Sequence, residues 1–121
     1  MTLEALSNML IANYDKIGAT AVISLNGSII YKTNNWTVDG GQLINVFKNK
    51  EPSLSIQGIK YSTLDVNPDR IIATNISGQG HIVGAAVDDK ALLIAYINSE
   101  GDPRSAYIEV DRIARQMAKT I

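Results

Sequence analysis

Two short apolar runs stand out in the second half of the chain. Ile82–Val87 reads IVGAAV, Ala91–Ile97 reads ALLIAYI, and the polar residues Asp88-Asp89-Lys90 separate them. Apolar runs rich in β-branched residues on either side of a polar turn are typical of a β-hairpin. The second run lacks polar alternation, so we expect both faces of that strand to be covered. The pattern therefore predicts a central hairpin in a sheet with helical cover.

Helical periodicity marks both ends of the chain. Leu3, Leu6, Leu10 and Tyr14 recur at helical spacing and predict an amphipathic helix that stops before Gly18. Asp102-Pro103 is a capping residue followed by proline at the first helical position, which predicts a last helix from there toward Ile121.

The last helix has two different faces. One stripe is apolar and should pack on the sheet: Ala106, Val110, Ile113 and Met117. The opposite stripe carries Arg104, Ile108, Asp111, Arg112, Arg115 and Lys119. An isoleucine among charges is unusual on a face that meets only water, so this stripe is either a solvated face or a surface for a partner.

The middle of the chain predicts further strands and one short helix. Two strands, 19–25 and 28–32, flank Asn26-Gly27, a pair typical of a two-residue hairpin turn. Asp39 should cap a short helix through Lys48, buried through Leu43, Ile44 and Phe47. Later strands are expected at 54–56, in one or two pieces over 59–66, and at 70–76. Short hairpin connections predict one α+β domain over residues 1–121, with an antiparallel sheet of about six to seven strands.

Composition excludes several classes of function. The net charge of −1 gives no general attraction to a nucleic-acid backbone. The absence of cysteine excludes disulfides and thiolate chemistry. Neither apolar run approaches the roughly 20 residues that cross a bilayer, and the N-terminus lacks a secretion signal. We therefore expect a soluble cytoplasmic protein.

Four features resemble sites of chemistry, and each has a simpler structural interpretation. The glycines of 78–84 open into a strand and so do not form a dinucleotide fingerprint. Residues 65–69 start like a calcium loop, but Arg70 stands where that loop needs glycine. His81 has no second histidine or cysteine to join it, and Asp88-Asp89 lies in a solvated turn. We expect no catalytic, metal or cofactor site. Trp36 is open to two interpretations, a core residue or an anchor for a partner.

A series of short motifs follows in a fixed order. Gly58-Ile59-Lys60-Tyr61 (G-x-K-Y) precedes a glycine-rich turn, an apolar strand, a polar turn, the ALLIAY run, a proline turn and the final helix. Upstream lie Asn26-Gly27-Ser28-Ile29 and Thr33-Asn34-Asn35-Trp36. In order and spacing these motifs resemble the profilin family over nearly the whole chain, and the compact loops are most similar to the profilins of Asgard archaea.

The resemblance implies a fold and a partner. The fold would be a central antiparallel sheet with the N- and C-terminal helices together on one side. The partner would be monomeric actin, bound at its barbed-end face by a monomeric, cytoskeleton-associated protein that regulates polymerisation and nucleotide exchange. The implied actin-binding residues are Lys60, Ser62, Ala73, Asn75, His81, Ile82, Arg104, Tyr107, Ile108, Asp111 and Arg112. A slip of one residue in the strands would exchange their two faces.

Two further family traits are less well supported by the residues. Polyproline binding needs flat aromatic faces, yet the strand position that would carry tryptophan is Ile30 and the tail has no aromatic residue. Phosphoinositide binding needs a basic cluster, which Arg104, Arg112, Arg115 and Lys119 could form.

A roadblock/LC7-type domain is the alternative, because it shares much of the element order. That class forms homodimers and regulates small GTPases. The strand material from Leu54 to Val66 and the G-I-K-Y motif favour profilin. A small enzyme is a third possibility, supported only by His81 and scattered serines.

Overall fold

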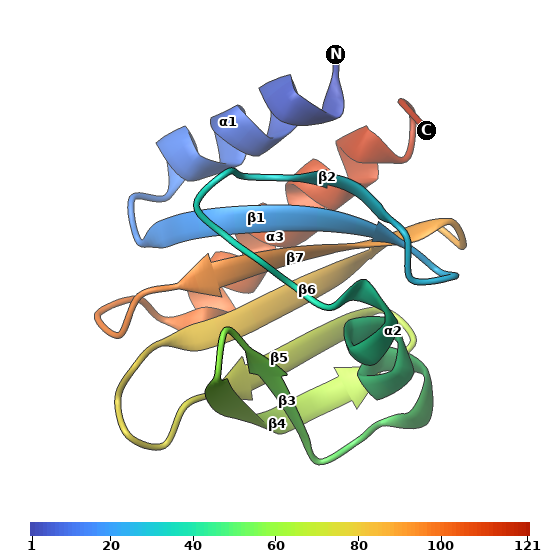
Figure 1. Ribbon diagram of the computed structural model, residues 1–121. Helices are drawn as coiled ribbons and strands as arrows, with labels where there is room; N and C mark the ends of the chain where they lie inside the picture. The colour runs from blue at the N-terminus through green and yellow to red at the C-terminus, as the bar shows by residue number, and fades with distance from the viewer.

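The computed structural model describes all residues, 1–121, and builds one seven-stranded antiparallel sheet with three helices (Figure 1). The helices are α1 (Leu3–Asn13), α2 (Gly40–Asn49) and α3 (Pro103–Met117). The strands are β1 (Ile17–Ser24), β2 (Ile29–Lys32), β3 (Ser53–Ile56), β4 (Ile59–Asn67), β5 (Arg70–Thr74), β6 (His81–Val87) and β7 (Ala91–Ile97). They lie in the order β2-β1-β7-β6-β5-β4-β3. The predicted α+β class and helix placement are confirmed.

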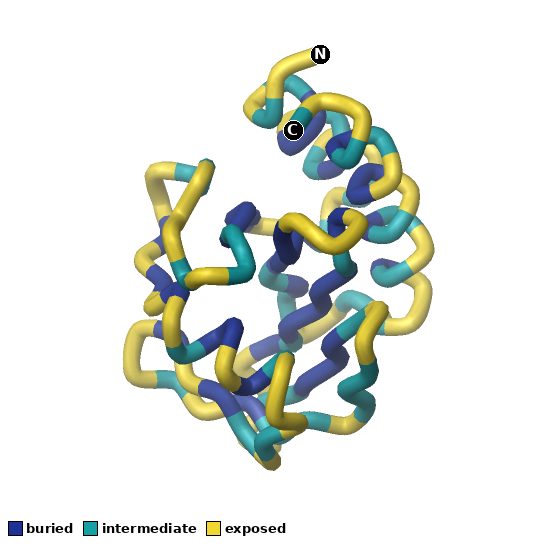
Figure 2. Tube along the Cα trace, turned by 90° about the vertical axis from the view of Figure 1, so that its right-hand side faces the viewer, coloured by how far each residue is buried: buried dark blue, intermediate teal, exposed yellow.

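The ALLIAYI run forms β7, which lies between β1 and β6. Six of its seven residues are buried, because helices cover the sheet on both faces here. Figure 2 shows the buried residues following the strands through the middle of the molecule, while exposed residues occupy the loops and the outer sides of the helices. The expectation that this strand is covered on both faces is confirmed.

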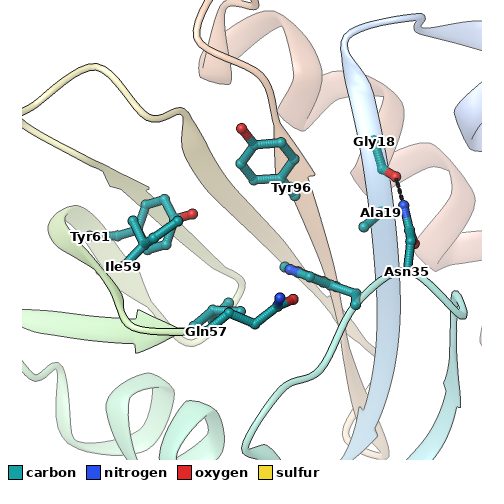
Figure 3. Close-up of a pocket in the computed structure, with 9 residues that line it drawn as sticks. Gly18, Ala19, Asn35, Gln57, Ile59, Tyr61 and Tyr96 are labelled. Carbon is teal, nitrogen blue, oxygen red and sulfur yellow. Dashed lines mark hydrogen bonds between the residues drawn. The ribbon is translucent and has the colours of Figure 1, made fainter.

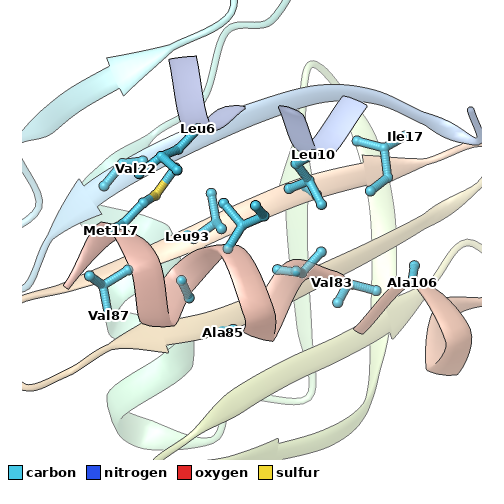
Figure 4. Close-up of a cluster of buried hydrophobic side chains, with 14 of the residues drawn as sticks. Leu6, Leu10, Ile17, Val22, Val83, Ala85, Val87, Leu93, Ala106 and Met117 are labelled. Atoms are coloured by element: carbon cyan, nitrogen blue, oxygen red, sulfur yellow. The ribbon is translucent and has the colours of Figure 1, made fainter. Parts of the chain in front are cut away.

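The two terminal helices cover one face of the sheet. The apolar stripe of α3 packs on β6 and β7, and α1 packs on β1 and against α3 (Figure 4). Leu6, Leu10 and Met117 meet Val22 and Leu93 in one apolar cluster. The predicted stripe of Ala106, Val110, Ile113 and Met117 is fully buried. Helical periodicity therefore predicted the packing face of α3 correctly.

The short helix α2 covers the opposite face. Leu43, Ile44 and Val46 pack over Ile23 and Ile94, whereas Phe47 is only half-buried. Trp36 belongs to the same cluster and is 6% exposed. The core interpretation of Trp36 is therefore correct, since so buried an indole does not project from the surface as an anchor for a protein partner.

Three local predictions were wrong. The first helix ends at Asn13, and Gly18 lies inside β1 rather than at a helix stop. The β1–β2 turn is longer than the predicted two residues, because the Ser24 N–H donates to the Ser28 carbonyl. Within the turn only Gly27 has a positive φ, 95°. Strand β5 ends at Thr74, so Ile76 lies in a turn. The uncertain stretch after Gly58 is one strand, β4, with a bulge between Thr63 and Asp65.

Capping residues set where the last helix begins. The Asp102 carboxylate accepts hydrogen bonds from the Arg104 and Ser105 amides, both at 3.3 Å, and from the Ser105 hydroxyl at 2.7 Å. The hydroxyl bond and the amide bonds lower the pKa of Asp102 despite some desolvation.

None of the three helices has the length and apolar character of a membrane-spanning helix.

Candidate functional site

One half of the sheet has no helix on the face that α1 and α3 share. Helix α3 lies over β6 and β7 and only reaches the margin of β5, so β4 and β5 are left open. The strand register places Ser62 opposite Thr74, and Thr74 opposite His81. These three residues form a row across the open half of the sheet, next to the exposed side of α3.

The row matches part of the predicted surface. Ser62 and His81 are half-exposed and Lys60 is exposed, as a partner-binding surface requires. The Thr74 hydroxyl lies 2.8 Å from Nδ1 of His81, which holds the imidazole against the sheet. Sequence reasoning missed Thr74.

Two predicted binding residues are wrong. Ala73 and Ile82 are both 0% exposed and belong to the cluster beneath α2. Because side chains alternate along a strand, the residues that face the open side are their neighbours Thr74 and His81. Ala73 and Ile82 are therefore each one residue away from the exposed row of Ser62, Thr74 and His81.

Asn75 has a structural role in the turn that follows β5. Its amide nitrogen donates to the Lys60 carbonyl at 2.8 Å, and its amide oxygen accepts from the backbone of Ser77 and Gln79. These bonds hold the turn beside the open strands and leave Ile76 88% exposed at its tip. Asn75 therefore positions the edge of the surface, and its side chain is already hydrogen-bonded within the protein.

The exposed side of α3 forms the second half of the surface. Arg104, Ile108 and Arg112 are exposed, and Tyr107 and Asp111 are half-exposed. Ile108 is 62% exposed, the isoleucine that the sequence pattern marked as unusual.

Arg70 joins the two halves, through an ion pair within the strands and a contact with an aromatic ring of α3. The Arg70 Nε donates to Asp65 at 2.8 Å, and the guanidinium lies 5.3 Å from the centre of the Tyr107 ring. The hydrogen bond to Asp65 raises the pKa of Arg70. Strands β4 and β5 are thus tied to α3 along this boundary.

The bulge in β4 adds an apolar residue that sequence reasoning missed. Leu64 and Asp65 both lie opposite Ile72, and Leu64 is 59% exposed. The sequence did contain a sign of it, because Leu64 is an apolar residue at a position where the alternating strand pattern calls for a polar one. We call the combined surface the β4–α3 face: Lys60, Ser62, Leu64, Thr74, His81, Arg104, Tyr107, Ile108, Asp111 and Arg112.

The basic residues of α3 do not gather into one free cluster. Arg112 pairs with Glu109 at 3.0 Å, and Arg115 pairs with Asp111 at 2.9 Å. The remaining two are far apart, because Arg104 lies in the first turn of α3 and Lys119 lies beyond its last residue, Met117, so about 20 Å of helix separates them. Phosphoinositide binding stays a prediction, and these ion pairs weaken its basis.

The terminal helices offer no aromatic platform between their ends. Met1, Leu6, Gln116, Lys119 and Thr120 line the hollow there. Proline rings need flat aromatic faces, so the residues of this hollow do not suit a proline-rich segment.

A single sheet with helices on both faces and one open apolar and charged surface is typical of a small binding domain. Odin profilin from Odinarchaeota yellowstonii is 58% identical over 121 residues, which is all of both chains. Loki profilin-2 from Lokiarchaeum sp. is 32% identical over 130 residues, covering 98% of this chain and 97% of that one. The chain belongs to the profilin family.

Solved structures agree with this assignment. The complex of LokiProfilin2 with rabbit actin contains a chain with a TM-score of 0.89 and 31% identity, and each chain covers 100% of the other. A Streptomyces avermitillis roadblock/LC7 domain has a TM-score of 0.62 at 12% identity, a more distant likeness of fold alone. No protein-family model matches the chain.

Proposed function

We propose that this protein binds monomeric actin through the β4–α3 face and thereby regulates actin polymerisation in the cytoplasm. Membership of the profilin family supports the proposal, because solved structures of LokiProfilin1 and LokiProfilin2 are complexes with rabbit actin. Those two chains are 31% and 32% identical to this one and align with all of it.

The observation that carries the proposal is the exposure of Ile108 beside the open strands. Ile108 on α3 and Leu64 on β4 are large apolar residues that are 62% and 59% exposed. Exposed charged side chains lie on the same elements, Lys60 on β4 and Arg104 and Arg112 on α3. An apolar centre with a polar rim is the usual anatomy of a protein interface.

The action of such a complex is steric and conformational, with no covalent step. A profilin that covers the barbed-end face of an actin monomer prevents spontaneous nucleation and still permits delivery to growing barbed ends. It also loosens the nucleotide cleft, so the bound nucleotide exchanges faster. An interface of about 1,600 Å² would suit this transient contact.

Calorimetry with monomeric rabbit actin tests the proposal. Ile108→Glu places a charge in the apolar centre of the face and should weaken binding about a hundredfold. Arg112→Glu, one turn further along α3, should weaken it as well. Both side chains point away from the core, so both variants should unfold like the parent protein.

Ile30→Glu is the matched control. Ile30 is 45% exposed and lies on β2, at the far end of the sheet from β4. This variant should bind actin like the parent protein. Normal binding by Ile108→Glu and Arg112→Glu would refute the β4–α3 face.

Light scattering on the same sample separates the two classes considered from sequence. We expect a monomer that forms a one-to-one complex with actin. A stable homodimer that does not bind actin would instead favour regulation of a small GTPase.

A further inference from the structure

Three aromatic side chains line a hollow on the α2 side of the sheet, away from the β4–α3 face. Trp36, Tyr61 and Tyr96 surround a space of about 330 Å³, on the order of ten water molecules (Figure 3). Its lining includes the amides of Asn35 and Gln57 but no charged side chain. This space is at the lower end of the range for small-molecule sites.

Two polar groups in this lining have no partner in the protein. Tyr61 is 2% exposed and Trp36 is 6% exposed. Neither the Tyr61 hydroxyl nor the indole N–H of Trp36 makes a hydrogen bond within the protein, yet no buried side-chain nitrogen or oxygen is enclosed without a partner. Both groups must therefore reach the hollow, and Figure 3 shows the Tyr61 hydroxyl directed toward its centre. Both donors are therefore open to water or to a ligand in the hollow, and neither would have to give up a bond within the protein to bind one.

Tyr96, the third aromatic side chain of the lining, is held in place from both sides. The Tyr96 hydroxyl donates to the Gln79 carbonyl at 3.0 Å. A Cβ atom on Gly80 would lie 2.7 Å from the Tyr96 ring, and one on Gly18 would lie 3.4 Å from it. The ring therefore fits between two glycines, and the hollow needs little rearrangement before a ligand enters.

We propose that this hollow is a binding site for an uncharged planar ligand that carries a carbonyl acceptor, of the aromatic amide class. The flat apolar walls suit a ring, and the Tyr61 and Trp36 donors suit the carbonyl oxygen. An anion would find no positive side chain in the lining, and a cation would meet two inward-pointing donors.

Burial, with a smaller effect of Tyr96, raises the pKa of Tyr61, so its hydroxyl keeps its proton at neutral pH.

The site is independent of actin binding, because it lies on the other face of the sheet. Either proposal can therefore fail without the other.

Titration with benzamide, followed by ¹⁵N–¹H NMR, tests the site. Trp36 is the only tryptophan, so its indole N–H gives one unambiguous signal. Benzamide should shift that signal saturably, with a Kd on the order of 1 mM for a ligand of this size. Benzoate and benzylammonium should bind at least about tenfold more weakly, because each would bury an unpaired charge.

Tyr61→Phe removes one donor and keeps the ring. The parent protein uses that hydroxyl for no internal bond, so the fold should be unchanged while benzamide binds about fivefold more weakly. Tyr31→Phe is the matched control, since Tyr31 is half-buried against the core beneath α1 and α3. It should bind benzamide like the parent protein.

Three results would overturn the proposal. The Trp36 signal could stay unmoved at benzamide concentrations far above the expected constant. Tyr61→Phe could bind benzamide as tightly as the parent protein does. Either ion could bind as tightly as the amide.

Discussion

Ser7 and Thr20 are the two buried polar residues of the core, and they bond to each other. Ser7 lies on α1, Thr20 lies on β1, and both are 0% exposed. Their hydroxyls form a hydrogen bond inside an otherwise apolar contact. The pair therefore tests how an internal hydrogen bond contributes to the docking of the first helix.

Removing one partner should cost more than removing both. Ser7→Ala leaves the Thr20 hydroxyl buried on a strand with no other partner, at a cost of about 1–3 kcal/mol in the free energy of unfolding. Thr20→Val should cost less, about 0.5–1 kcal/mol, because a helical serine can turn to the carbonyl four residues earlier. The double variant replaces both hydroxyls with apolar groups and should lie within about 1 kcal/mol of the parent protein.

Urea unfolding of the four proteins measures this coupling. The parent stability should lie in the usual range of about 5–15 kcal/mol, so each difference is measurable from the midpoint. We expect the double variant to be more stable than Ser7→Ala alone. If the two single losses simply add in the double variant, the reasoning about the unpaired hydroxyl is refuted.

Two further predictions concern the cap of α3 and the turn after β5. The pKa of Asp102 is lowered in the folded state, so its charge stabilises the protein above the unfolded pKa. Asp102→Asn should therefore be less stable than the parent at pH 7. The urea midpoints of the two proteins should converge as the pH falls below about 4, because the carboxylate is then protonated. A difference between the midpoints that stays the same at every pH would contradict this. Gly80 has φ +112°, and its Cβ would lie 2.6 Å from the Ile97 carbonyl, so Gly80→Ala should cost at least about 2 kcal/mol. Gly78 has φ +86° with open space around it, so Gly78→Ala should lower the free energy of unfolding by only about 1 kcal/mol. Equal losses in the two variants would show that the contacts at Gly80 do not matter.

The helical part of the candidate surface could be predicted from the sequence. The 3.6-residue period of α3 separated Val110 and Ile113, which are buried, from Ile108, which is exposed. The helix needs no partner to define its two faces, because the period is a local property of the backbone. The central hairpin was predictable for a similar reason, since β6 and β7 are adjacent in the chain.

The strand part could not be predicted as reliably. Ala73 and Thr74 are neighbours, and which of them faces the partner depends on pairing with β4 and β6. The bulge at Leu64 shifts that pairing by one residue. No residue in β5 alone marks the shift, and Ala73 and Ile82 therefore lie on the buried face, while Lys60 and Ser62 lie on the predicted one.

The sequence by itself determined the element order, the buried stripe of α3 and the covered central strand. Those features depend on spacing between residues close in the chain. Only the tertiary structure decided that β4 and β5 lack helical cover, and that Trp36, Tyr61 and Tyr96 surround one hollow. These arrangements depend on where α3 and the loop before α2 come to rest on strands far away in sequence, which local periodicity cannot specify.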